Sequence, residues 1–190
     1  LYHTSDGHPL FTVELVRTMR ERKGLVQDAA GCWREGSALD WDSLPSRLEA
    51  LIGERIDRLP PAQRAVLEVA GVEGEEFTAE VVADVLGHDV GELIRQLSKG
   101  LGRQHHLVTA VDVQNVAGRH LSHYRFRHIL FQRYLYNGLD ATERRQLHES
   151  VARSLQARTQ GQPQQIAAVA GQLAKHFERA DLLEQAIPYA

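Results

Sequence analysis

Apolar side chains recur every three or four residues along most of this chain, which is the spacing of an amphipathic helix. The first such stretch follows Pro9, and its basic end comes just before Gly24. Proline suits a first helical turn, cations favour the last turn, and glycine favours the position after it. The elements predicted for this part are a helix over 9–23, a hairpin of two short strands over 25–35 and a helix over 46–58.

The middle of the chain combines helical stretches with extended ones. We expect Gly71 and Gly74 to end one helix and Thr78 to cap the next. Asp89 and Glu92 stand at capping-box spacing, which favours a third helix after them. Aromatic and arginine residues then alternate with period two, which predicts a strand. The elements predicted here are helices over 61–70, 79–86 and 90–101, a short strand over 105–111, a turn over 112–119 and a strand over 120–127.

The last part of the chain is predicted to be helical again. Asp140 and Glu143 form another capping box at the start of a long apolar-periodic stretch. The predicted elements are helices over 128–137, 141–158 and 166–177, a polar linker over 159–165 and the start of a further helix at 182. Two antiparallel helices of this kind would begin a tetratricopeptide-like array, in which each repeat buries its apolar face against the next.

These elements predict a mainly α protein in three parts. Three helices followed by a two-stranded hairpin is the order of a winged helix. We therefore predict a helical unit over 1–58, a winged helix with a small β-hairpin wing over 59–138, and a helical bundle over 139–190 that starts tetratricopeptide-like repeats. Hydrophobic residues make up 43% and charged residues 25%, a composition that supplies a core of ordinary size.

Charge and cysteine content narrow the class of protein. The net charge is -3 with the histidines neutral, so no overall basic field attracts nucleic acid, although a local basic patch stays open. Cys32 is the single cysteine, which excludes an intrachain disulfide and suits a cytoplasmic location. No apolar run reaches the roughly 18 residues that span a bilayer, so we expect no membrane partner. The sequence starts at Leu1 without an initiator methionine, from which we expect a piece of a longer protein.

The sequence has no phosphate-binding loop. The pattern G-x-x-x-x-G-K-[ST] does not occur, and no glycine is followed by lysine. In such a loop, backbone amides and the lysine cradle a triphosphate. We therefore expect no ATP hydrolysis, and no enzyme activity, from this chain by itself.

Histidines are frequent, but their spacing gives no catalytic or metal-binding motif. His105 and His106 lie beside a predicted strand, and His120 and His123 lie on the predicted wing. A zinc site needs three or four converging ligands, commonly cysteines, and Cys32 is distant in the sequence. A nucleophile needs an oriented base, and no local motif supplies one. We therefore predict solvated or packed histidines, no metal site and no catalytic residue.

A basic face in the middle of the chain supports a separate hypothesis. Arg95, Lys99 and Arg103 lie at four-residue spacing in the third helix of the predicted winged helix, so they share a face. On a recognition helix such a face would contact DNA phosphates. The alternative is a solvated basic edge, which Glu92 favours because its charge weakens the field. We prefer the solvated basic edge, and contact with DNA stays open.

Several short motifs, taken in order, resemble one protein family. SDGHPLF, from Ser5 to Phe11, resembles the small-residue GxP segment of STAND ATPases, the signal-transduction ATPases with numerous domains. Further segments look like its bacterial members, which carry an adenylate/guanylate cyclase or transcription-activation domain: LPSRLEALIGERIDRLPPAQRAVLEVAGVEGEEF, YRFRHILFQRYLYNGL, RRQLHESVARSL and LAKHFERA. The resemblance covers essentially the whole chain. The family's order of NTPase core, helical lid, winged helix and tetratricopeptide-like repeats would make 1–58 the lid.

The resemblance implies nucleotide contacts for three residues. Pro9 would pack near the adenine of ATP or ADP, with Gly7 allowing close backbone approach, and His128 would turn toward the β-phosphate of ADP. Without the resemblance, Gly7 to Pro9 is a helix start and His128 is a histidine packed between strand and helix. Both contacts depend on an NTPase core, so ATP/ADP is expected as a cofactor of the intact protein, with neither site complete in this segment.

The resemblance also implies partners and a mechanism. The partners are an upstream NTPase core, an output domain and, after activation, further copies in a homo-oligomer. Lid and winged helix would close on ADP and hold the protein inactive, and exchange for ATP would release the winged helix. Nucleic acid is disfavoured as a partner. Two alternatives stay open, a DNA-binding winged-helix regulator and a helical protein-interaction module.

Overall fold

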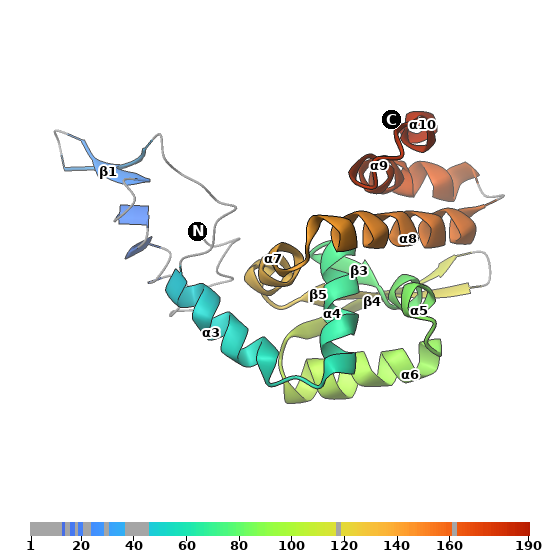
Figure 1. Ribbon diagram of the computed structural model, residues 1–190, viewed down its shortest axis with the longest axis horizontal. Coiled ribbons are helices and arrows are strands. Elements are labelled where there is room, and N and C mark those ends of the chain that lie inside the picture. Colours follow the sequence, from blue (N-terminus) through green and yellow to red (C-terminus); the bar gives the residue numbers. More distant parts are fainter. Residues whose placement is uncertain are drawn as a thin grey trace.

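The computed structural model is mainly helical, with two small antiparallel sheets (Figure 1). The structure describes residues 13, 16–17, 19–20, 24–28, 31–36, 46–116, 119–160 and 163–190. The helix predicted over 9–23 falls mostly outside these residues and stays a prediction. Strands β1 (Leu25–Gln27) and β2 (Trp33–Glu35) pair antiparallel, and α3 spans Ser46–Asp57, which confirms the hairpin and the second helix.

The second sheet joins a strand from between two helices to a hairpin that comes later in the chain. In chain order the elements are α4 (Pro61–Glu73), β3 (Glu76–Thr78), α5 (Ala79–Leu86), α6 (Val90–Arg95), the π-helix η1 (Gln96–Gln104), β4 (Val108–Val116) and β5 (Arg119–Phe126). The spatial order of the strands is β3-β5-β4, all antiparallel, so β5 is central. The period-two pattern predicted the hairpin, but β3 was not predicted, because three residues are too few to show a period.

Strand β4 extends further along the chain than predicted. Residues 112–116 were assigned to a turn, yet pairing continues as far as Val116 opposite Arg119. The assignment was wrong because a register shift between Ala110 and Asp112 breaks the alternation, after which the strand resumes.

Helix α4 does not stop at Gly71, which corrects the prediction. It runs to Glu73, and Gly74 ends it with a φ of 151°. The Gln132 side chain of α7 donates a hydrogen bond of 2.7 Å to the Gly71 carbonyl. The last carbonyls of a helix lack intrahelical donors, so this tertiary contact supports the final turn. A glycine inside a helix costs about 1 kcal/mol relative to alanine, and packing against α7 offsets that cost.

The start of α5 also differs from the prediction in its detail. Thr78 precedes the helix in an extended conformation, but its side chain makes no capping bond. Its backbone N–H donates instead to Glu73 Oε1 at 3.0 Å. The end of α5 follows the sequence signal, because Gly87 adopts the left-handed conformation with a φ of 66°.

The third helix changes its winding part of the way along. Asp89 caps α6 by accepting a hydrogen bond of 2.9 Å from the Glu92 N–H, which is one of the two bonds of the predicted capping box. From Gln96 the winding is that of a π-helix, and it continues to Gln104, so the end predicted at Gly102 is wrong. A side chain at Gly102 would place its Cβ only 2.8 Å from the Leu97 carbonyl oxygen. Glycine is therefore required there by the close approach of the wider turns.

Helices form the remainder of the chain. They are α7 (Ile129–Gly138), α8 (Ala141–Thr159), α9 (Pro163–Arg179), α10 (Leu183–Ala186) and the 3-10 helix η2 (Ile187–Tyr189). The capping box is confirmed: Asp140 Oδ1 accepts from the Glu143 N–H at 2.8 Å, and Glu143 Oε2 accepts from the Asp140 N–H at 3.0 Å. Helices α8 and α9 pack together in opposite directions (Figure 1). None of the helices in the described ranges has the length and apolarity to cross a bilayer.

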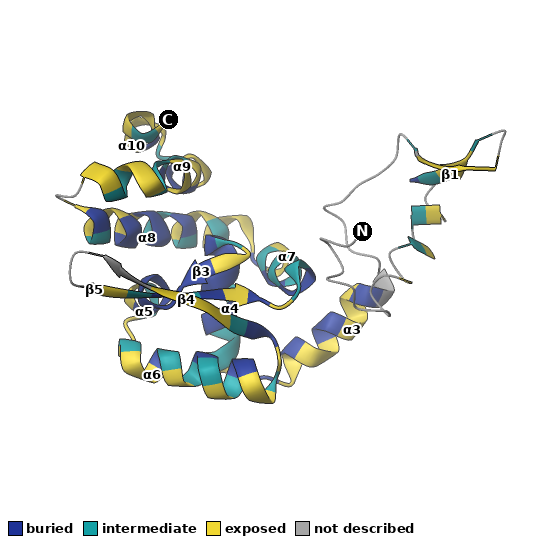
Figure 2. Ribbon diagram, turned by 180° about the vertical axis from the view of Figure 1, so that it is seen from behind, coloured by how far each residue is buried: buried dark blue, intermediate teal, exposed yellow. Residues whose placement is uncertain are grey.

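One hydrophobic core connects these elements. It extends from Leu48 in α3 to Ala186 in α10, and Figure 2 shows its buried surfaces on α4, β3 and α8. Phe77 lies against two aromatic rings of β5, with centroid distances of 6.0 Å to Tyr124 and 5.4 Å to Phe126. Such aromatic pairs contribute about 0.5–1.5 kcal/mol each beyond their area, which explains why the three-residue β3 stays paired.

Candidate functional site

The residues expected to contact a nucleotide fall in two regions. Gly7 and Pro9 lie outside the described residues. His128 lies two residues after the end of β5 and is the N-cap residue of α7, with an extended backbone. Its half-buried ring lies 6.1 Å from the ring of Phe131, one turn into the helix. The imidazole therefore lies at the positive end of a ten-residue helix.

Arg55 of α3 reaches the same junction. Its guanidinium lies 5.3 Å from the centroid of the Phe131 ring, the ring that His128 also contacts. It also donates a hydrogen bond of 2.7 Å to the His105 carbonyl, just after η1. A cation, an imidazole and a helix N-terminus thus gather where α3 meets α7, an arrangement that favours an anion. Sequence reasoning did not single out Arg55, since the helical pattern alone places it on a polar face.

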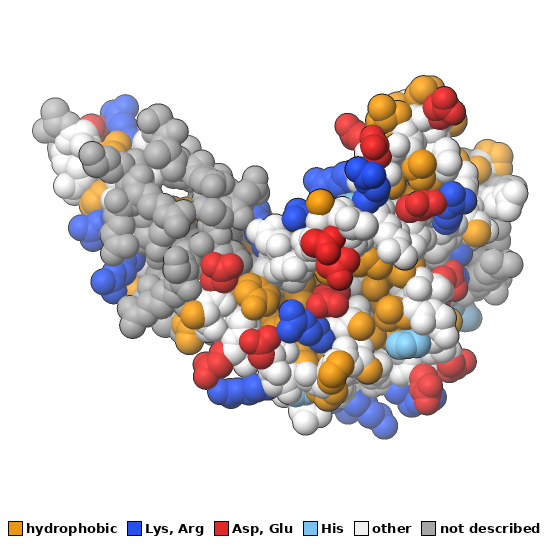
Figure 3. Space-filling model, viewed as in Figure 1, with side chains coloured by type: hydrophobic (Ala, Val, Ile, Leu, Met, Phe, Trp, Pro, Cys, Tyr) orange, Lys and Arg blue, Asp and Glu red, His pale blue; other side chains and the backbone are white. Residues whose placement is uncertain are grey.

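The basic residues proposed for DNA contact are exposed but do not form an uninterrupted basic face. Arg95 ends α6, and Lys99 and Arg103 lie on η1. Figure 3 shows basic side chains along the lower edge of the molecule, around α6, with acidic ones beside them. The acidic neighbours weaken the positive field along this edge, as the sequence alternative of a solvated basic edge expects.

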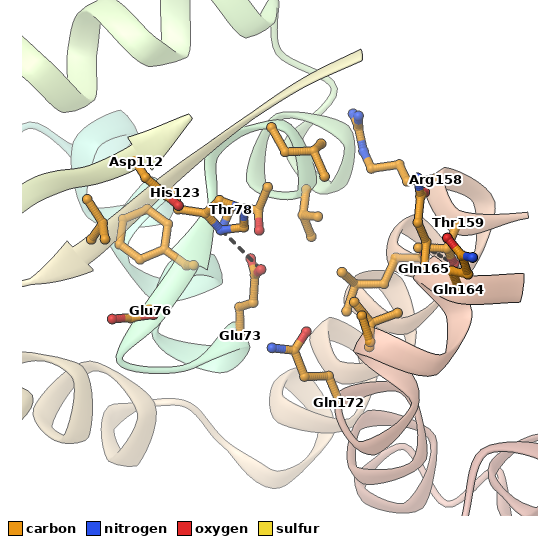
Figure 4. Close-up of a pocket in the computed structure, with 17 residues that line it drawn as sticks. Glu73, Glu76, Thr78, Asp112, His123, Arg158, Thr159, Gln164, Gln165 and Gln172 are labelled. Carbon is orange, nitrogen blue, oxygen red and sulfur yellow. Dashed lines mark hydrogen bonds between the residues drawn. The ribbon is translucent and has the colours of Figure 1, made fainter. Parts of the chain in front are cut away.

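A pocket that the sequence analysis missed lies between the second sheet and helices α8 and α9. Its volume is about 410 Å³, within the range of small-molecule sites. Figure 4 shows Glu73 extending into it from the end of α4, with Gln165 and Gln172 entering from α9. Phe77 and Val169 belong to its apolar wall.

Glu73 is the least expected group in this pocket. Only 9% of its surface is exposed, and Oε1 accepts the Thr78 N–H while Oε2 has no hydrogen-bond partner among the described residues. Burial raises the pKa of Glu73 to about 8, against the opposing effect of the hydrogen bonds from Thr78. The carboxyl is therefore mostly protonated at neutral pH. The signal in the sequence was an acid at helical spacing from Val66 and Ala70, on a face that is otherwise apolar.

A buried polar network joins α7, α8 and α9. His148 and His176, each 1% exposed, approach each other with 2.8 Å between their Nδ1 atoms. Tyr136 O–H lies 3.0 Å from His148 Nε2, and Arg179 donates to the Tyr136 oxygen at 3.0 Å.

One set of ring protons satisfies every contact of this network. Burial lowers the pKa of His176, and the opposing effect of the Glu73 backbone favours the tautomer that donates from Nε2 and leaves Nδ1 as an acceptor. His148 then donates from Nδ1 and accepts the Tyr136 proton at Nε2. Both imidazoles are neutral in this arrangement, and the network ties α4, α7, α8 and α9 together.

Comparison with known proteins gives no family to which the site can be assigned. No family model, curated protein or solved structure matches the chain. Among the described residues, no three His, Cys, Asp or Glu side chains are grouped so that they could hold a metal ion. The candidate sites are therefore the α3–α7 junction at His128 and the pocket at Glu73.

Proposed function

We propose that this chain is the regulatory segment of a nucleotide-dependent signal-transduction ATPase of the STAND type. In this proposal residues 59–138 are a winged helix, and α8 to α10 begin tetratricopeptide-like repeats. One observation carries it: the order α4, β3, α5, α6–η1, β4, β5, with β5 central, leads directly into His128 at the N-cap of α7. The resemblance assigns the ADP-sensing histidine to that same junction.

The electrostatics of the junction support an anion-sensing role. His128 and the first turn of α7 offer hydrogen-bond donors, and Arg55 adds a positive charge at the same end of the helix. A β-phosphate would gain these contacts only while α3 and α7 stay together. Bound ADP would therefore stabilise the closed arrangement and hold the output inactive.

Replacing His128 by alanine in the intact protein is the direct test. We expect the Kd for ADP to rise about tenfold or more, because a hydrogen bond to a charged group contributes about 1.5–3 kcal/mol. Basal output should rise in the same variant, since ADP no longer holds the closed state. The measurements are ADP release from the purified protein and the activity of its output domain.

The matched control is His88→Ala, which removes an exposed histidine at the turn between α5 and α6. It should leave both ADP release and output unchanged. Equal ADP affinity in the His128→Ala variant and the wild type would contradict the proposed role, provided that both unfold at the same temperature.

A second candidate, DNA binding, is kept because Arg95, Lys99 and Arg103 are all exposed. If they bind phosphates, replacing all three by glutamine should weaken binding to random duplex and lower the slope of its salt dependence by about 0.9 for each phosphate released. Fluorescence anisotropy at several salt concentrations measures both. A control with the same charge change replaces three exposed cations of α8 and α9, Arg145, Arg153 and Lys175. An equal effect of the two triple variants would exclude a specific DNA-binding face.

A further inference from the structure

Three buried polar atoms without hydrogen-bond partners among the described residues line the pocket between the second sheet and α9. They are Glu73 Oε2, His123 Nε2 and Gln165 Oε1. Each such atom costs about 1–3 kcal/mol when it stays unsatisfied, so folded proteins retain few of them. Because they converge on a single cavity, this pocket is a candidate site for a polar ligand. Gln165 offers an oxygen acceptor, and Glu73 offers a second one once its carboxyl is ionised, so a ligand with hydrogen-bond donors would satisfy both.

The charge of the pocket favours a cation. Glu73, Glu76 and Asp112 line it, and Arg158 is the basic side chain among its lining residues. Arg158 is engaged elsewhere, since its Nε and Nη2 both donate to the carboxylate of Asp84 at 2.8 Å. The charge of Arg158 is therefore largely offset by Asp84, and ionisation of Glu73 would give the pocket a negative charge that favours a cation.

The rest of the wall is apolar. Phe77, Val81, Leu155 and Val169 come from β3, α5, α8 and α9. These side chains suit the hydrocarbon part of a small ligand, and the volume of about 410 Å³ accommodates one. A ligand that combines a cationic donor with an apolar body would satisfy both halves of the pocket.

We propose that this pocket binds a small primary amine with an apolar body, and that its ammonium group pairs with the carboxylate of Glu73. The apolar body lies against Leu155 and Val169. Because the lining comes from both the β3–β5 sheet and helices α8 and α9, the bound amine links the two parts and stabilises their contact. This ligand site does not rest on the nucleotide proposal, since His128 and Arg55 are not among the residues that line the pocket.

Binding is coupled to release of a proton. The pKa of Glu73, raised by burial to about 8, means that the carboxyl must ionise before it pairs with an ammonium group. Amine affinity should therefore increase roughly tenfold between pH 6.5 and pH 7.5. Calorimetry in phosphate and in Tris should give different heats, because the two buffers differ in their enthalpy of protonation.

The probes are phenethylamine, its uncharged counterpart phenethyl alcohol and its anionic counterpart phenylacetate, titrated into the whole chain and followed by NMR. We expect phenethylamine to shift resonances of Phe77, His123 and Val169. The alcohol should bind at least about tenfold more weakly, and phenylacetate should not bind, because charge-assisted hydrogen bonds are about twice as strong as neutral ones.

Glu73→Gln should weaken phenethylamine binding at least about tenfold and abolish its dependence on pH. The control Glu75→Gln changes an exposed acid two residues away that does not line the pocket, and it should bind as the wild type does. Should Glu73→Gln not fold, the pH dependence and proton release of the wild type test the same pairing. Equal affinity for amine and alcohol, full binding by Glu73→Gln, or no shift at about 10 mM probe overturns the proposal.

Discussion

Lowering the pH from 6.5 to 4.5 is expected to reduce the free energy of unfolding, because His148 and His176 stay neutral in the folded chain. Burial, with the positive charges of Arg179, Lys175 and Arg144, lowers the pKa of His148 from 6.5 to about 4. Burial, then the neighbouring His148, lowers the pKa of His176 to about 3. Protonating either ring sets N–H against N–H across the 2.8 Å contact and breaks the network.

The direction of this change in stability depends on how many protons the folded and the unfolded chain bind. Below pH 6.5 the unfolded chain protonates both histidines and the folded chain does not, so each lowers stability by about 1.4 kcal/mol per pH unit. Glu73 acts in the opposite direction, because its proton is bound only in the folded chain between its ordinary pKa of 4.5 and its raised value of about 8. Together the three groups lower the free energy of unfolding by about 1.4 kcal/mol for each pH unit below 6.5. The free energy of unfolding is therefore expected to be highest near pH 6.5.

Two variants separate these contributions in urea unfolding measured across the pH range. The double variant His148→Leu/His176→Leu should lose the acid sensitivity, so that its slope differs from that of the wild type by about 2.7 kcal/mol per pH unit. Glu73→Gln should instead steepen the acid loss and flatten the profile between pH 6.5 and 8. His88→Ala removes an exposed histidine and should keep the wild-type slope. A double histidine variant whose profile stays parallel to the wild type would refute the account of the network.

Substituting alanine for Gly102 should destabilise the chain by about 1–3 kcal/mol, the range for overfilled sites. The new Cβ would lie 2.8 Å from the Leu97 carbonyl oxygen and 3.5 Å from that of Val108, and backbone atoms have little room to yield. The strain acts on the junction of η1 with β4, next to the buried side chain of Leu101. Urea unfolding measures the loss of stability, and circular dichroism reports whether the helical content is retained.

The same substitution at Gly171 should have the opposite sign. Gly171 lies inside α9, and a Cβ there meets no atom within 4 Å. Alanine should therefore stabilise the helix by about 0.5–1 kcal/mol, because glycine loses more backbone freedom on folding. If both variants change stability by the same amount, helix propensity and not the close approach at Gly102 explains the effect.

The sequence by itself determined the features that depend on neighbours in the chain. The capping box at Asp140 and Glu143 and the left-handed Gly87 need only a few adjacent residues, so local chemistry settles them. The amphipathic spacing likewise indicated the mainly helical class and the hairpin before α7. These elements are fixed by side chains that act within one turn of their own backbone.

The contacts between residues far apart in the sequence were decided only by the tertiary structure. Gly71 stays helical because Gln132, 61 residues later, reaches its carbonyl. The Thr78 side chain makes no capping bond, and its backbone N–H donates to Glu73, which only the folded core brings to it. The candidate pocket and the histidine network form only when α4, α8 and α9 pack together. The spacing of residues along the chain does not predict which helices pack against each other. Burial then shifts the pKa of Glu73 and of both histidines, because the cost of a charge depends on the surroundings that the whole fold creates.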